Sequence, residues 1–170
     1  MIRYTSTARL LHWTMALLIV ANLILGFAHD ALPKGFPVMP IHKSIGITVL
    51  ALTILRVVWR LTHRPPPLPA NLPAWEKGAA HLTHFFFYAF MLVLPLSGWI
   101  LTSAGTRPLN WFFLFDVPKF GVSKEDAIVG LSRSAHEVLP WIWVALLLVH
   151  IGAALRHHFI LKDDVLRRMI

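Results

Sequence analysis

The sequence contains no cysteine, and charged residues are scarce in it. The absence of cysteine excludes disulfides, thiolate nucleophiles, iron–sulfur ligation and the covalent attachment of haem through a C-x-x-C-H motif. Only 14% of the 170 residues are charged, whereas a soluble domain carries about 25%. With 56% hydrophobic residues and a mean hydropathy of +0.63, this composition predicts an integral membrane protein.

Acidic residues are the scarcer of the two charge types, since 8 Asp and Glu stand against 16 Lys and Arg, a net charge of +8. A basic balance can indicate nucleic-acid binding. Here the basic residues are scattered around apolar runs and form no basic helix face. Membrane topology therefore explains them, and we expect no nucleic-acid partner.

Four apolar segments are visible, at about 10–28, 41–61, 79–103 and 135–155. Each is near the ~20 residues that a spanning helix needs, and a backbone in lipid must satisfy its own hydrogen bonds. We therefore predict an all-α fold with one domain over residues 1–170. It is an integral membrane four-helix bundle with helices at about 8–28, 41–61, 75–103 and 133–158. The first segment is interpreted as an uncleaved anchor, because it is long for a signal peptide and residues 28–31 make a poor cleavage site.

Local signals refine these helices. Pro40 suits the first turn of the second helix, and Pro95 predicts a kink in the third. The spacing of Ser134 and Glu137 is that of a capping box, which predicts the start of the fourth helix.

The flanking Lys and Arg residues predict the orientation. The N-terminus, the second connection and the C-terminus hold ten of them, and the other side holds six. We therefore expect both termini in the cytoplasm of a bacterial cell and a multi-pass protein of the inner membrane. Residues 64–69 are then a stiff, proline-rich cytoplasmic linker. Residues 104–130 form a long outer loop whose aromatic run, 111–115, is expected in the membrane interface.

Histidine is the informative polar residue in these apolar segments. His136 and His150 are fourteen residues apart, about four helical turns, so both imidazoles share one face roughly 21 Å apart along the axis. His12 opens the first helix at the depth of His150, and His42 opens the second at the depth of His136. A planar haem clamped between helices needs one imidazole on each face. We therefore predict two non-covalent b-type haems, with axial pairs His12–His150 and His42–His136.

Two alternatives to haem explain these positions less well. Single histidines at helix ends often face lipid headgroups without a ligand, but that does not explain two pairs at matched depths. Zinc is disfavoured because its sites want three or four clustered ligands.

Other polar residues are candidates for supporting roles. His81 and His84 share a face of the third helix and are expected to assist a haem without binding iron, although either could replace His12 or simply line the interface. Lys43 and Arg133, beside the outer ligands, are candidates for propionate pairing or for steering an anion. His157 lies one heptad beyond His150 and is the first candidate for binding a quinone carbonyl, with Arg156 and His158 as alternates.

The ordered set of motifs resembles the bacterial cytochrome b-561 family of small four-helix di-haem membrane proteins. The resemblance covers nearly the whole chain. Its motifs are Leu11-His12-Trp13, Ile41-His42 with Gly46 and Arg56, His81-x-x-His84 with Tyr88, His136-Glu137, His150, His157-His158-Phe159, Lys162-Asp163 and Leu166-x-x-Met169. The resemblance implies the same four haem ligands, quinone-linked electron transfer and, in some members, oxidation of superoxide.

The expected function is therefore electron transfer across the inner membrane between a periplasmic-side donor and the quinone pool, with ubiquinone as the bound substrate. Bis-histidine iron has no open coordination site, which favours electron transfer over oxygen binding. Two alternatives stay open. One is an oxidoreductase acting alone, from superoxide to ubiquinone, and the other is a cytochrome b anchor subunit of a dehydrogenase or hydrogenase complex. Membrane lipid, quinone and a periplasmic redox partner or superoxide are the expected partners.

Overall fold

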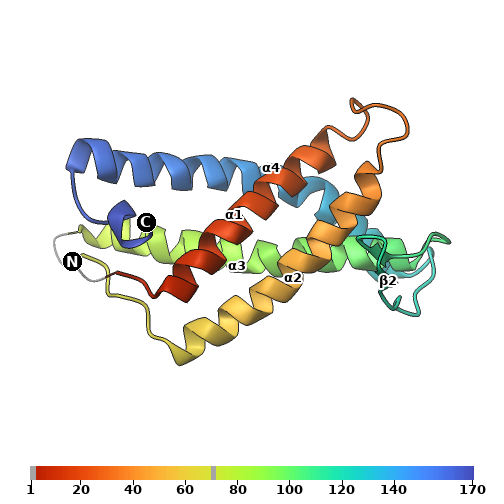
Figure 1. The fold of residues 1–170 in the computed structure, drawn as a ribbon, viewed down its shortest axis with the longest axis horizontal. Coiled ribbons are helices and arrows are strands. Elements are labelled where there is room, and N and C mark those ends of the chain that lie inside the picture. Colours follow the sequence, from red (N-terminus) through yellow and green to blue (C-terminus); the bar gives the residue numbers. More distant parts are fainter. Residues whose placement is uncertain (1–2, 70–71) are drawn as a thin grey trace.

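The computed structural model describes residues 3–69 and 72–170, and its main elements are four long helices (Figure 1). They are α1 (Ser6–Phe27), α2 (Val38–Thr62), α3 (Ala74–Ser103) and α4 (Ala127–Leu155). Along the chain, each helix packs on the next, α1 on α2, α2 on α3 and α3 on α4. Both termini lie at one end of the bundle, as four crossings require. The prediction of an all-α four-helix bundle is confirmed.

All four helices are long and apolar enough to cross a membrane. Their outward faces carry large exposed apolar side chains, such as Leu17 (72% exposed) and Leu148 (66%). Contiguous apolar surface of this kind is unfavourable in water and is typical of lipid-facing helices. The chain is therefore a multi-pass membrane protein.

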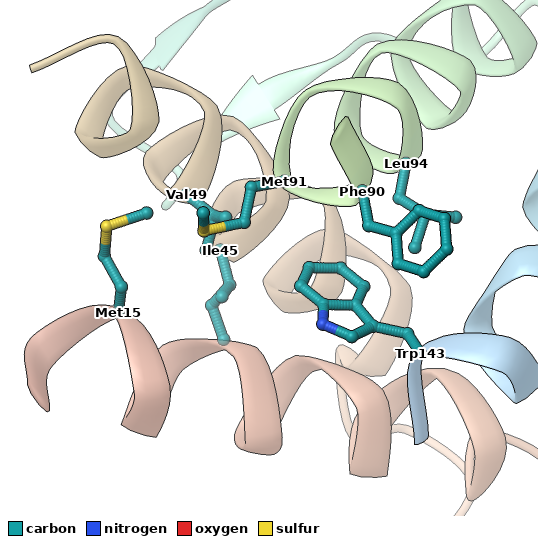
Figure 2. Packing of buried hydrophobic residues seen from close by; sticks show 7 residues of the cluster. All are labelled: Met15, Ile45, Val49, Phe90, Met91, Leu94 and Trp143. Atoms are coloured by element: carbon teal, nitrogen blue, oxygen red, sulfur yellow. The ribbon is translucent and has the colours of Figure 1, made fainter. Parts of the chain in front are cut away.

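The bundle centre holds a small apolar cluster to which every helix contributes (Figure 2). Trp143 of α4 points into it and is only 4% exposed. Because Trp143 is seven residues from both His136 and His150, it lies on their face of α4, between their two levels. The cluster comprises Met15, Ile45, Val49, Phe90, Met91, Leu94 and Trp143.

The start of α4 differs from the sequence prediction. The helix begins at Ala127 with Asp126 as N-cap, not at about residue 133. The cause is a local turn, because the Ser123 backbone N–H and hydroxyl both donate to the Asp126 carboxylate, at 2.9 and 3.1 Å. Ser134 lies inside the helix, where its hydroxyl donates to the Gly130 carbonyl. The capping box was therefore a wrong prediction, whereas Pro40 does lie in the first turn of α2.

The end of α4 also changes form. Regular α-helix stops at Leu155 and continues as a π-helical segment, η1 (Arg156–Leu161), which ends at Lys162 in a left-handed conformation. A 3-10 turn, η2 (Leu166–Arg168), follows. The C-terminal residues then return to α1, where the Trp13 indole donates to the Met169 carbonyl at 2.8 Å. At the inner end, the name used below for the end holding both termini, the C-terminal tail therefore contacts α1.

The connection between α3 and α4 forms a two-stranded antiparallel hairpin, β1 (Asn110–Trp111) and β2 (Phe115–Asp116). It docks on α2 through hydrogen bonds from the Trp111 indole to Thr48 at 3.0 Å and from the Phe112 N–H to Ser44 at 2.9 Å. The side chains of residues 113–115 stay exposed. The hairpin marks the outer end of the bundle, opposite the termini.

Candidate functional site

Two histidines from non-consecutive helices face each other at the outer end, and they are called the outer pair below. His42 comes from the second turn of α2 and His136 from α4. Their ring centroids are 6.1 Å apart and their planes are inclined at 85°. The predicted partners at this depth are therefore brought together.

Neighbouring helices fix the rings of the outer pair. His42 Nδ1–H donates to the Asn22 carbonyl of α1 at 3.1 Å, and His136 Nδ1–H donates to the Leu94 carbonyl of α3 at 3.2 Å. Ser97 adds a contact to His136 Nδ1 at 2.9 Å while bonding the same Leu94 carbonyl. A carbonyl only accepts, so Nδ1 carries the proton and the Nε2 lone pair is left for a metal.

Two glycines make room for these rings. A Cβ on Gly26 would approach His42 Cε1 to 3.1 Å, and a Cβ on Gly98 would approach His136 Cε1 to 3.0 Å. Both distances are tighter than most contacts in packed proteins. Glycine at these positions therefore lets α1 and α3 pass close behind the imidazoles.

Three histidines gather toward the inner end, and they are called the inner cluster below. His12 of α1 lies 6.4 Å from His150 of α4, and His84 of α3 lies 6.0 Å from His150, measured between ring centroids. Phe87 packs edge-on against His150 at 5.2 Å. An Arg56 N–H approaches His12 Nδ1 at 3.3 Å. Across residues 3–69 and 72–170, no three or more His, Cys, Asp or Glu side chains are grouped as for a metal ion.

The imidazole spacings fit a bis-histidine haem. A metal–imidazole nitrogen bond is about 2 Å and the ring centre lies about 1.1 Å behind the nitrogen, so two axial rings have centroids about 6.2 Å apart. The outer pair, His12–His150 and also His84–His150 meet this requirement.

Helix packing distinguishes the two inner possibilities. The pairs His42–His136 and His12–His150 each join helices with at most sparse mutual contact in the described part of the chain. A groove of ≈ 410 Å³ also lies between α1 and α4, lined by Val20, Leu23 and Val144 among others but by neither His12 nor His150. His84 and His150, in contrast, join α3 to the tightly packed α4. A flat macrocycle needs a gap, which favours His12 over His84.

The other residues predicted to assist a haem differ in their exposure. His81 is exposed, so it does not accompany His84 into the inner cluster. Lys43 is half-buried within electrostatic reach of Arg107 and Lys119. Arg133 is exposed on α4, one turn before His136.

The three candidates for quinone binding lie in η1. His157 Nδ1 bonds Asp163 at 2.6 Å, and its Nε2 is 3.7 Å from a carboxylate oxygen of Glu76. Arg156 pairs with the other Glu76 oxygen at 3.2 Å. His158 packs against the ring of Phe159 instead, with centroids 4.7 Å apart.

Several site residues were not found from the sequence. The carbonyls of Asn22 and Leu94 carry no sequence signal, because every residue has a carbonyl. Glu76 did carry a sequence signal, since it is the single acidic residue in the first turn of α3. Gly26 also carried a sequence signal, because a glycine inside an apolar helix often allows another group to pack closely against it.

Comparison with known proteins gives a consistent result. The family model for prokaryotic cytochrome b561 matches residues 3–170. Cytochrome b561 homolog 2 of Escherichia coli (strain K12) is 33% identical, covering 99% of this chain and 91% of its own length. Cytochrome b561 homolog 1 of the same organism is 33% identical over 99% and 97%. A protein of Yersinia pestis named probable superoxide oxidase CybB is 27% identical over 94% and 91%.

Proposed function

The chain belongs to the prokaryotic cytochrome b561 family, and on that premise we propose that it is a di-haem b-type cytochrome. It carries electrons across the bacterial inner membrane between a donor on the outer side and the quinone pool. Both termini lie in the cytoplasm, as the excess of Lys and Arg at the inner end predicts.

The observation that carries this proposal is the presence of two imidazole pairs, 6.1 and 6.4 Å apart, between helices that leave room for a flat group. His42 and His136 hold the outer haem, and His12 and His150 hold the inner one. Haem iron bound by two imidazoles supplies one-electron transfer without an open coordination site. The protein orients the ligands through the Asn22 and Leu94 carbonyls and excludes water with the apolar cluster around Trp143.

Quinone is proposed to bind at the inner end, beside His157. This imidazole is held by Asp163 through Nδ1, which leaves Nε2 to exchange a proton with a quinone oxygen. Glu76 has a buried carboxylate oxygen without a hydrogen-bond partner 3.7 Å from that nitrogen. The two groups together offer a proton donor and acceptor, which a carrier reduced with proton uptake requires. Arg156 and His158 are the alternates.

A second candidate function is superoxide oxidation coupled to quinone reduction. It is favoured by the positive charge of Lys43, Arg107 and Lys119 near the outer pair, because such a patch attracts an anion. The name of the Yersinia pestis relative points the same way. Two superoxide ions would release the two electrons that one ubiquinone takes up with two protons.

The purified protein tests the proposal directly. A redox difference spectrum with haem counted per chain should give two b-type haems, and acid–acetone should extract all pigment because no cysteine can hold it. One haem per chain, or pigment that stays on the polypeptide, would contradict the proposal. Rapid reduction of the haems by superoxide would establish the second function. If quinol reduces the haems and superoxide does not, the donor on the outer side is a protein.

A further inference from the structure

A pocket of ≈ 330 Å³ opens at the inner end, and none of the four proposed haem ligands lines it. Its walls come from the N-terminal segment, the end of α2, the proline-rich stretch 65–67, Tyr88 of α3 and Met169 of the tail. These segments meet where both termini and the end of α2 lie (Figure 1). The pocket is therefore built from parts of the chain that are far apart in sequence.

Its lining is strongly basic. Arg3, Arg56, Arg60 and Arg64 line it together with His63, and no Asp or Glu does. The acidic residues of this end are engaged elsewhere: Glu76 with Arg156, Asp163 with His157 and Asp164 with Arg167. Positive charge without a carboxylate partner at a membrane surface favours an anionic ligand.

Two of these arginines are held side by side. Arg56 and Arg60 are four residues apart on α2, and their guanidinium carbons lie 5.6 and 5.7 Å from the centre of the same Tyr88 ring. Like charges at this spacing repel each other on a helix, while the ring face attracts each of them. An oxyanion between them would relieve the repulsion and accept bidentate hydrogen bonds from their planar donors.

The surroundings match a lipid rather than a soluble ion. Trp59 lines the pocket, stacks on His63 at 3.7 Å and donates to Thr5 at 3.1 Å, an anchoring typical of the membrane interface. Next to these residues, Leu55, Val58 and Leu61 of α2 are more than half exposed, at 51%, 53% and 80%. A headgroup in the pocket would leave its acyl chains along this apolar surface.

We propose that this pocket binds the phosphate of an anionic phospholipid of the inner leaflet. Arg56, Arg60 and Arg64 surround the phosphate, and Tyr88 keeps Arg56 and Arg60 directed toward it. The cytoplasmic leaflet is rich in such lipids, and each basic side chain near its surface strengthens their binding about fivefold. The site does not depend on electron transfer, but its place in the inner leaflet rests on the proposed orientation with both termini in the cytoplasm.

A haem propionate is another source of the same anionic oxygen chemistry. Arg56 is its natural contact, because this side chain also reaches His12 Nδ1 at 3.3 Å. Arg60 lies one helical turn beyond Arg56 on α2, within electrostatic reach of His84, and Arg64 follows the end of that helix. Substituting Arg60 and Arg64 while keeping Arg56, and measuring both lipid binding and haem content, therefore distinguishes a lipid from a propionate.

The test compares two double variants. One combines Arg60→Gln with Arg64→Gln, and the other combines Lys162→Gln with Arg167→Gln. Both remove two positive charges at the inner end, but only the first pair lines the pocket. Delipidated holoprotein in detergent is titrated with dioleoyl phosphatidylglycerol and followed by native mass spectrometry, with phosphatidylcholine as the neutral-headgroup probe. The pocket variant should bind phosphatidylglycerol about 10- to 30-fold more weakly, and the control variant within about threefold of the parent protein.

Equal binding by the two double variants would overturn the proposal. So would unchanged lipid binding combined with a lower haem content or a shifted haem potential in the pocket variant, because that result assigns these arginines to a propionate. If the double variant does not accumulate, Arg64→Gln alone, beyond the end of α2, should still weaken binding about fivefold. No weakening there would also count against the site.

Discussion

The outer pair and the inner cluster differ in what holds each imidazole. In the outer pair, each Nδ1–H is bound by a backbone carbonyl of a neighbouring helix, and a glycine makes room behind each ring. In the inner cluster, both His12 and His84 lie close enough to His150 to be its partner. His12 Nδ1 faces the Arg56 guanidinium, which can only donate a hydrogen bond. Both imidazoles of the outer pair therefore have a free Nε2 lone pair, as the proposed haem ligation requires, whereas His12 does not.

This difference has a chemical consequence. With Arg56 donating to Nδ1, the proton of neutral His12 lies on Nε2, the nitrogen that would have to bind iron. Haem binding by His12 therefore requires a change of tautomer and the loss of this contact with Arg56. We expect the outer site to bind haem more tightly and the inner site to respond more strongly to its neighbours.

The largest expected effect is the loss of one whole haem. His42→Ala and His136→Ala should each remove the outer haem, while His12→Ala and His150→Ala should each remove the inner one, because an axial nitrogen is lost. Haem per chain should fall from two to one, or a five-coordinate iron that binds carbon monoxide should remain. The two members of a pair must leave the same residual spectrum and potential, and different residual spectra for His42→Ala and His136→Ala would refute the pairing.

A smaller effect is expected when a methyl group is placed against the imidazole ring of His136. Gly98→Ala places a methyl group 3.0 Å from His136 Cε1, and overpacking of this kind costs about 1–3 kcal/mol. Outer haem affinity should fall about tenfold or more, measured by haem retention during dilution. Gly130→Ala on α4 is the matched control, because a Cβ there meets no atom within 4 Å. Equal haem retention in the two variants would show that the glycine does not serve the site.

The next effect is a change of potential at one site only. Arg56→Gln removes a positive charge beside His12. Because this removal stabilises the oxidised haem, the inner midpoint potential should fall by about 50–100 mV. Lys43→Gln is the outer counterpart and should lower the outer potential by less, since Lys43 is partly exposed. Potentiometric titration resolves the two haems. A shift of the outer haem by Arg56→Gln would break the assignment of this arginine to the inner site.

The smallest effect concerns His84. Its replacement by Leu should leave six-coordinate, low-spin spectra at two haems per chain and shift the inner potential by at most a few tens of mV, as changes around a ligand do. His81→Leu, at an exposed position on the same helix, should change nothing. Loss of a full haem in His84→Leu would instead make His84 the partner of His150, since the two rings already lie 6.0 Å apart.

The sequence predicted the bundle well because lipid imposes simple rules on length and hydropathy. It also predicted that His42 meets His136 and that His12 meets His150, since depth follows from position along a helix. It failed at the start of α4, where a turn around Asp126 competes with the capping box at Ser134. The presence of His84 near His150 was harder to predict, because depth alone does not tell which helices lie side by side.

The contribution of α4 to both histidine pairs has a consequence for biogenesis. The first three helices emerge from the ribosome with His12, His42 and His84, but neither proposed pair is complete without His136 or His150. The segment after α4, which reaches back to α1 at Trp13, is synthesised later than α4 itself. Cofactor loading should therefore follow the insertion of the final helix, and a chain truncated before residue 127 should enter the membrane colourless.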